Sequence, residues 1–184
     1  MTEIILYPTE TVYGLGVNPL EPGALEVLNE LKGRDEGKYA SWLVASVSDI
    51  EKYAVLSETA KAIAKMWLPG PLTLVLPARP EIDEALLGPM RTISFRISTD
   101  PITQTLAEEL AHPLTCTSAN VSGMTPENTP DAILEQFGES AAKITKIIDG
   151  GERSGEPSTV VRVIDDTIEV IREGAIPASE FASK

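Results

Sequence analysis

Short apolar runs of strand length recur along the whole chain and outnumber the helical segments that lie strictly between them. Most of these runs are rich in β-branched residues and end at proline, glycine or polar residues, a pattern that favours strands. The predicted strands are residues 3–8, 41–47, 72–78, 92–97, 114–118, 146–150, 158–164 and 167–173. Because helices do not separate these strands one by one, we expect a mixed sheet rather than a purely parallel one.

Helical segments are marked by leucine spacing and by residues that suit helix ends. Leu25, Leu28 and Leu31 repeat at helical spacing between Pro22 and Gly33. The predicted helices are residues 22–33, 57–67, 82–87, 101–111 and 129–137, with a further capping box at Ser48 and Glu51. No internal repeat, low-complexity tract or linker divides the chain, so we expect one layered α/β domain over residues 1–184.

The composition is that of an ordinary soluble globular protein, with 42% hydrophobic and 23% charged residues. No apolar run approaches the roughly 20 residues that span a bilayer, and the first residues, MTEII, lack the basic region and apolar stretch of a secretion signal. The single cysteine, Cys116, cannot form an internal disulfide. We therefore expect a cytoplasmic protein that does not bind membranes.

The net charge of −13 argues against a broad surface that follows nucleic-acid phosphates, because such a surface needs clustered lysine and arginine. A set of basic residues nevertheless falls inside short polar motifs: Lys32, Arg34, Lys38, Arg91, Arg96 and Arg172. Each one alone is explained equally well by a surface ion pair. As a group, they predict a basic pocket for a small polyanion in an otherwise acidic protein.

Seven short motifs carry polar residues that a fold alone does not require. They are YPTETVYGLG at 7–16, KGRDEGK at 32–38, WLPGPLTLVLP at 67–77, RTISFRI at 91–97, TSANVSG at 117–123, PSTVVRV at 157–163 and IREG at 171–174. In order and spacing, over nearly the whole chain, they resemble the YrdC family of threonylcarbamoyl-AMP synthases. The resemblance implies a YrdC-like layered fold, in which helices flank a mixed, twisted sheet.

The same resemblance implies an enzyme of the nucleotidyltransferase class. Its reaction would condense L-threonine, bicarbonate or CO2, and ATP to threonylcarbamoyl-AMP and pyrophosphate. That product would supply the N6-threonylcarbamoyladenosine (t6A) modification of tRNA. Transfer to tRNA is expected to need other proteins of the t6A pathway.

By resemblance, four residues contact the threonine substrate: Thr11, Arg96, Cys116 and Ser158. An arginine fork suits an amino-acid carboxylate, and Arg96 lies on a strand among apolar neighbours, where an unpaired cation is costly. Pairing of Arg96 with one of the many acidic residues is the structural alternative. Cys116 is expected to shape the pocket rather than attack a substrate, because nothing brings a base such as His112, the only histidine, within its reach.

Five residues match family positions that contact ATP: Arg34, Lys38, Thr92, Ser118 and Arg172. The planar guanidinium of arginine donates hydrogen bonds to two phosphate oxygens at once, and the ammonium of lysine adds a positive charge on a flexible side chain. For Lys32 and Arg34 a purely structural role is the alternative, since cations favour the C-terminal end of a helix. No residue is expected to act as a nucleophile, and Lys32, Arg34 and Lys38 are expected to affect the rate most.

The sequence contains no motif for a protein-bound metal, a serine triad or a Walker loop. We expect Mg2+ to arrive on ATP and no metal to be ligated by the protein itself. The chain departs from the usual family pattern at Asp35 and at Tyr39 and Ala40, where proline and leucine are common. Two alternatives therefore stay open: a YciO-like paralogue with a different substrate, and an RNA-binding or ribosome-maturation module. For the synthase itself we expect at most weak RNA binding.

Overall fold

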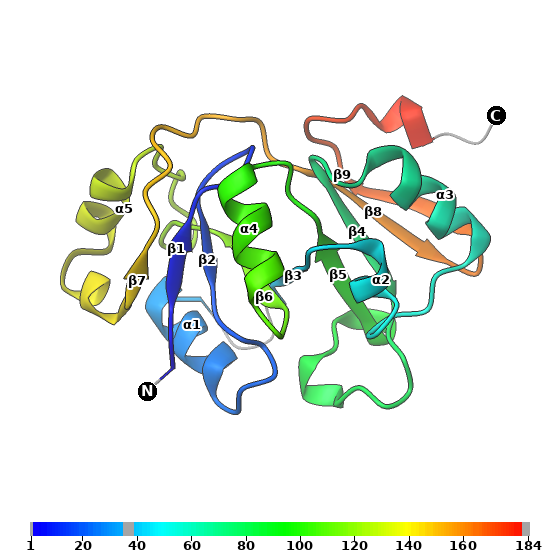
Figure 1. The fold of residues 1–184 in the computed structure, drawn as a ribbon, viewed down its shortest axis with the longest axis horizontal. Coiled ribbons are helices and arrows are strands. Elements are labelled where there is room, and N and C mark those ends of the chain that lie inside the picture. Colours follow the sequence, from blue (N-terminus) through cyan, green and yellow to red (C-terminus); the bar gives the residue numbers. More distant parts are fainter. Residues whose placement is uncertain (1, 35–38, 182–184) are drawn as a thin grey trace.

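The computed structural model describes residues 2–34 and 39–181. Within these ranges the strands form one twisted sheet in the order β7-β1-β2-β6-β3-β5-β4-β8-β9 (Figure 1). The strands are β1 (Ile5–Tyr7), β2 (Gly14–Gly16), β3 (Ser41–Leu43), β4 (Leu72–Pro77), β5 (Thr92–Arg96), β6 (Leu114–Ser118), β7 (Lys146–Ile147), β8 (Thr159–Ile164) and β9 (Thr167–Arg172). The pairs β1 with β7, β3 with β5 and β4 with β8 are parallel, and the other pairs are antiparallel. The predicted mixed sheet is confirmed.

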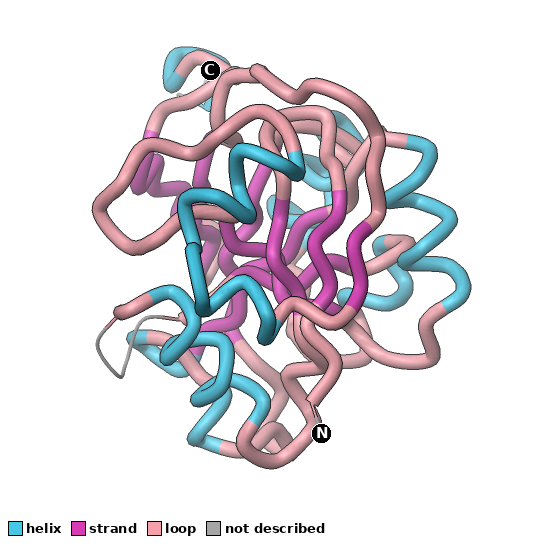
Figure 2. The backbone as a smooth tube through the Cα atoms, turned by 90° about the vertical axis from the view of Figure 1, so that its left-hand side faces the viewer, coloured by secondary structure: helices cyan, strands magenta, loops and turns pink. Residues whose placement is uncertain are grey.

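Helices lie on both sides of the strands, as the side view in Figure 2 shows. The α-helices are α1 (Ala24–Lys32), α2 (Val47–Ile50), α3 (Glu58–Trp67), α4 (Pro101–Glu109) and α5 (Pro130–Phe137). Short 3-10 helices are η1 (Glu84–Leu86), η2 (Pro89–Arg91), η3 (Gly138–Lys143) and η4 (Ala178–Phe181). Ser57, Asp100 and Thr129 cap α3, α4 and α5 with their side chains, which satisfies amide groups that a helix start leaves free. None of the described helices combines the length and the hydropathy of a membrane span.

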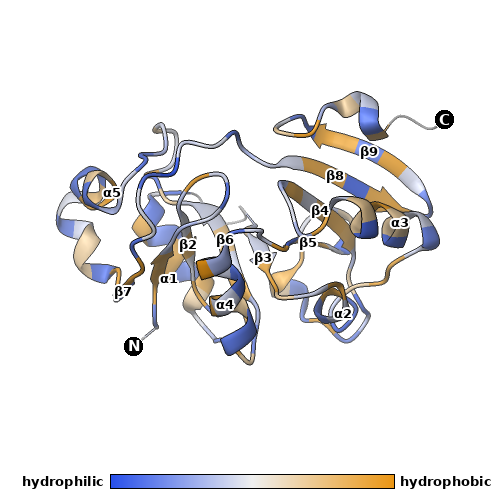
Figure 3. Ribbon diagram, turned by 45° about the horizontal axis from the view of Figure 1, so that its top comes forward, coloured by the Kyte–Doolittle hydropathy of each residue, from blue (hydrophilic) through white to orange (hydrophobic). Residues whose placement is uncertain are grey.

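The hydrophobic core is divided by the sheet. Helices α2 and α3 cover one face of β3, β4, β5 and β8, where Trp42 and Phe95 pack edge to face. Helices α1 and α5 cover one face of β1 and β2 around Leu6, whereas α4 packs through Leu106 against Tyr7. In Figure 3, α2, α3 and α4 each carry both hydrophilic and hydrophobic residues, as half-buried helices should. This packing leaves a second face of β4, β5 and β8, which carries the polar residues Thr73, Ser94 and Arg96 together with Val160.

Strand β2 lies where the sequence predicted a loop. Two of its three residues are glycines, which weaken the strand signal. The structure shows why Gly16 is there, since a Cβ at this position would come within 2.4 Å of Cγ of Leu114 on the neighbouring strand β6. The glycines therefore allow β1, β2 and β6 to pack closely, and β2 connects β1 to β6 within the sheet.

The region from 41 to 50 also differs from the prediction. The strand predicted over 41–47 ends at Leu43, and α2 begins at Val47. Ser46, rather than Ser48, is the N-cap, because its side chain accepts the hydrogen bond from the Asp49 amide. The predicted capping box is therefore wrong.

Other differences are changes of bounds rather than of element type. The first helix begins at Ala24 and not at residue 22, because Gly23 in the left-handed region precedes it. The helix predicted over 82–87 is the short η1, and the strand predicted over 146–150 is the two-residue β7. The turn predicted between the last two strands is confirmed, with Asp165 and Asp166 both at positive φ.

Candidate active site

A cavity of about 500 Å³ opens over the polar face of the sheet. Its walls come from the loop after β1, the segment that leads into β3, the middle of β5, the end of β6, and the segments that begin β4 and β8 and end β9. All four residues predicted to contact threonine and two of those predicted for ATP line it: Thr11, Arg96, Cys116, Ser158, Ser118 and Arg172. Six of the seven sequence motifs thus converge on one space, and KGRDEGK contributes no described residue to its wall.

Strand β5 shows how the fold separates the core from the cavity. Ile93 and Phe95 belong to the hydrophobic core, while Ser94 and Arg96 line the cavity. This alternation is the one predicted from the sequence, since successive side chains of a strand point to opposite faces. The neighbouring strand β4 follows the same rule and presents Thr73 to the cavity between core leucines.

Arg96 is almost fully buried, with 8% of its side chain exposed, and its guanidinium is held on one side by the loop after β1. Its Nη2 atom donates to Oε1 of Glu10 at 3.0 Å and to Oγ1 of Thr11 at 2.6 Å. Thr11 is steadied in turn by Thr9, whose hydroxyl oxygen lies 3.0 Å from that of Thr11. Arg96 is therefore paired with an acid, as the structural alternative predicted, and also forms part of the cavity wall, while its contact with threonine stays a prediction.

Arg172 reaches the same cavity from the end of β9 because the β8–β9 ladder contains a register shift. Val161 pairs with Val170, but Val160 pairs with Arg172, so Ile171 is the extra residue of a β-bulge. Val160 lines the cavity, and its partner Arg172 is therefore turned to the same face. Without the bulge, Ile171 would stand opposite Val160.

Hydrogen bonds fix Arg172 beside the start of β8. Its Nη2 atom donates to the main-chain oxygen of Ser158 at 2.7 Å, and the Ser158 hydroxyl lies 2.8 Å from that of Thr73. Burial lowers the pKa of Arg172, and the positive charge of Arg96 lowers it further. An arginine remains charged despite such shifts, so two guanidinium groups face one space and favour anions there.

Lys32, the last residue of α1, lies beneath the turn that follows β6 rather than in the cavity wall. Its Nζ atom donates to the main-chain oxygens of Ser118 and Asn120. Asn120 also ties this turn internally, since its side chain donates to the main-chain oxygens of Val121 and Met124. Burial, followed by the nearby charge of Arg34, lowers the pKa of Lys32 to about 7.

The remaining residues predicted for ATP have varied positions. Arg34 lies at the edge of the cavity, where its Nη1 atom is 3.4 Å from the hydroxyl of the lining residue Thr117, and Nε donates to Asn29. Thr92 is buried and donates to the main-chain oxygen of Pro89, and the structure does not bring it to the cavity wall. Lys38 lies outside the described residues. The roles of these residues stay predictions.

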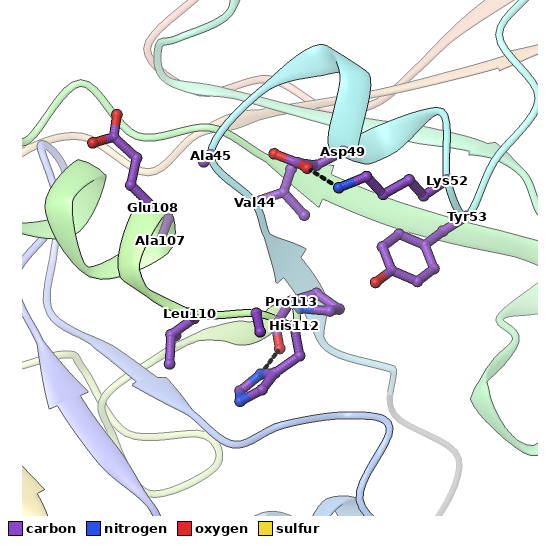
Figure 4. Close-up of a pocket in the computed structure, with 11 residues that line it drawn as sticks. Val44, Ala45, Asp49, Lys52, Tyr53, Ala107, Glu108, Leu110, His112 and Pro113 are labelled. Carbon is purple, nitrogen blue, oxygen red and sulfur yellow. Dashed lines mark hydrogen bonds and ion pairs between the residues drawn. The ribbon is translucent and has the colours of Figure 1, made fainter.

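Cys116 lines the cavity in a half-buried position, as a shape-forming residue should. His112 belongs to a second, smaller cavity of about 240 Å³ between α2 and α4, where its ring contacts the Pro113 carbonyl (Figure 4). In the same view Asp49 and Lys52 form an ion pair at 2.6 Å and neutralise each other. The one histidine and the one cysteine thus line different cavities.

Several lining residues carry chemistry that the sequence reading did not assign to the site. Thr73, Ser94 and Asn120 all present polar groups to the cavity. The polar-apolar alternation of LTLVLP could have identified Thr73, as it did Arg96 on β5. Glu10 stands in the motif YPTETVYGLG without a predicted role, and its contact with Arg96 joins residues 86 positions apart.

Known proteins resemble this chain over almost its whole length. A protein-family model described as "Telomere recombination", covering Sua5, YciO and YrdC, matches residues 2–174. The chain belongs to the Sua5/YciO/YrdC family. The resemblance drawn from the motifs is therefore confirmed.

Among curated relatives of this family member, the threonylcarbamoyl-AMP synthase of Photobacterium profundum is 35% identical over 94% of this chain and 92% of its own length. The crystal structure of Pyrococcus abyssi Sua5 complexed with L-threonine superposes with a TM-score of 0.88 and 35% identity over 97% of this chain. This chain spans 52% of that Sua5 chain, about half its length. Escherichia coli YciO superposes with a TM-score of 0.87 and 28% identity, covering 98% of this chain and 87% of YciO. The predicted fold class, a mixed twisted sheet with flanking helices, is confirmed.

Proposed function

We propose that this chain is an L-threonylcarbamoyl-AMP synthase, which condenses L-threonine, bicarbonate and MgATP to threonylcarbamoyl-AMP and pyrophosphate. The observation that carries the proposal is the pair Arg96 and Arg172, which line one cavity from different strands. A reaction between two anionic substrates needs two such positive groups side by side. The relatives named as synthases, and the threonine bound to Sua5, support the choice of substrates.

The lining residues divide between the two substrates. Thr11, Arg96, Cys116 and Ser158 would hold threonine, with the guanidinium of Arg96 on its carboxylate. Arg172, Ser118 and the edge residue Arg34 would hold ATP, together with the predicted contacts of Lys38 and Thr92. Magnesium enters as part of the substrate MgATP, where it keeps several of its waters.

The chemistry requires no nucleophile from the protein. The amine of threonine attacks bicarbonate or CO2 and forms an N-carboxylate. Water is lost when bicarbonate is the source, and a proton is released to solvent when CO2 is the source. An oxygen of this N-carboxylate then attacks the α-phosphorus of ATP. The bond between the α-phosphorus and the oxygen that bridges to the β-phosphorus breaks, and pyrophosphate leaves. The cavity contributes proximity and fixed positive charge for the developing oxyanions. Cys116 forms part of the wall, and no residue is assigned as general base.

The proposed setting is the t6A pathway in the cytoplasm, with other pathway proteins transferring the threonylcarbamoyl group to tRNA. A second candidate, a YciO-like activity on another substrate, is favoured by one observation, since YciO superposes almost as closely as Sua5. An RNA-binding role is less favoured because the net charge of the chain is −13.

Pyrophosphate release distinguishes these functions. Purified protein with MgATP, L-threonine and bicarbonate should release pyrophosphate, and omission of threonine should abolish most of it. Equal release without threonine would favour the YciO-like alternative. Salt-sensitive binding to RNA without any ATP turnover would favour the RNA-binding module.

A further inference from the structure

Glu10 occupies a position behind the cavity wall, where it contacts Arg96 but does not itself line the cavity. Its side chain is 15% exposed, and that of Arg96 is 8% exposed, so the ion pair at 3.0 Å is largely shielded from water. A cation at this depth without a counter-charge would be strongly unfavourable. Glu10 therefore supplies the negative charge that keeps Arg96 stable in its buried position.

The contact also fixes the direction of the guanidinium. Both hydrogen bonds that Arg96 donates to described residues use Nη2, one to Glu10 and one to Thr11. Nε has no partner among the described residues. The protein thus anchors the guanidinium through one nitrogen and leaves further donor capacity on a group that lines the cavity.

Glu10 is in turn held by elements outside the cavity. Its second oxygen, Oε2, accepts a hydrogen bond from Ser98, and the Ser98 hydroxyl accepts one from the Asp100 amide. Asp100 caps α4 and pairs with Arg153 at 2.9 Å, on the segment between β7 and β8. The carboxylate is therefore fixed at both oxygens, and its position is set by the start of a helix rather than by the loop alone.

We propose that Glu10 is a positioning residue that orients Arg96 and Thr11 for the carboxylate of the amino-acid substrate. This inference rests on the proposed function. Glu10 acts through the two residues that it aligns and not by touching substrate. Its loss should therefore weaken the binding of threonine selectively and should leave the binding of ATP unchanged.

The test uses Glu10→Gln, which keeps the size of the side chain and removes its charge. Calorimetry should show a rise of at least about tenfold in the dissociation constant for threonine, and a change below about threefold for ATP. Glu169→Gln is the matched control, because Glu169 pairs with Arg162 on the exposed β8–β9 hairpin and should alter neither constant.

A double-mutant cycle separates positioning from a general structural effect. In an Arg96→Gln background, Glu10→Gln should weaken threonine binding by less than about threefold more, because its route of action is already lost. If Glu10→Gln fails to fold, Glu10→Asp replaces it, because aspartate keeps the charge on a shorter side chain. The dissociation constant of Glu10→Asp for threonine should lie between those of wild type and Arg96→Gln.

The outcomes are distinguishable. Unchanged threonine binding in a folded Glu10→Gln or Glu10→Asp protein, equal losses for both substrates, or additive effects in the cycle would each overturn the positioning role and leave the proposed function standing. A wild-type protein that binds no threonine would overturn both.

Discussion

Lys32 donates a hydrogen bond of 2.7 Å from Nζ to the main-chain oxygen of Asn120, and a second one to that of Ser118. The end of α1 is thereby tied to the turn after β6, which carries Ser118 into the cavity wall. Two acceptors also replace the water that this buried amine loses. The motif KGR therefore shapes the TSAN turn, in addition to any contact with ATP.

The buried amine of Lys32 should make stability depend on pH. Burial lowers its pKa in the folded protein to about 7 from the ordinary lysine value of 10.5. Between these values the unfolded chain holds a proton that the folded chain has released, so the free energy of unfolding rises with pH. From pH 7 to pH 9 the wild type should gain up to about 2 kcal/mol relative to Lys32→Met, measured by urea unfolding. A constant difference between the two proteins would contradict the lowered pKa.

Arg34→Ala should weaken ATP binding without unfolding the protein. Loss of a charge-assisted phosphate contact costs about 1.5 to 3 kcal/mol, while threonine binding should change little. Arg162→Ala is the control, since this arginine forms an exposed ion pair with Glu169. If calorimetry finds normal ATP affinity while the melting temperature collapses, the role of Arg34 is to close α1 and not to bind phosphate.

Cys116→Ser should remain an active enzyme. The thiol lines the cavity, but the one histidine lies in the second cavity, so no imidazole stands ready to activate it. Steady-state rates should stay within about tenfold of wild type, equivalent to about 1.4 kcal/mol in the barrier. Complete loss of turnover, with normal folding and normal binding of both substrates, would identify a catalytic thiol.

Deletion of Ile171 should remove the β-bulge and keep Arg172 in the cavity wall. Regular pairing would then continue from Val161 and Val170, and Arg172 would follow Val170 directly and stay opposite Val160. ATP affinity should therefore stay within about threefold of wild type, whereas Arg172→Ala should weaken ATP binding by about 1.5 to 3 kcal/mol. A loss in the folded deletion variant as large as that of Arg172→Ala would show that the position of Arg172 depends on the bulge itself and not on its pairing with Val160.

Much of the fold was accessible from the sequence because local patterns determine it. The alternation on β5 correctly divided Phe95 from Arg96, and Thr129 with Pro130 marked the start of α5. Strand β2 was missed because its glycines have no strand propensity of their own, and only the approach of Leu114 from β6 explains them. Tertiary packing determines whether such a segment forms a strand, and a short stretch of sequence does not contain that information.

The features of the candidate site fall into the same two groups, those that local sequence patterns identify and those that only tertiary contacts explain. Thr11, Arg96, Ser158 and Arg172 were identified by motif, and the structure brings them to one cavity. The bulge at Ile171 and the contact between Glu10 and Arg96 could not be predicted, because each depends on pairing between distant segments. A single sequence shows which groups are present but not which of them face one another.

The most direct test of the central claim follows the carbon of bicarbonate. The wild-type protein is incubated with MgATP, L-threonine and carbon-13 bicarbonate, and the products are analysed by mass spectrometry. The account predicts an adenylate that contains threonine and one carbon-13 atom, formed in equal amount to pyrophosphate. Pyrophosphate released with AMP alone, or an adenylate without the labelled carbon, would contradict it.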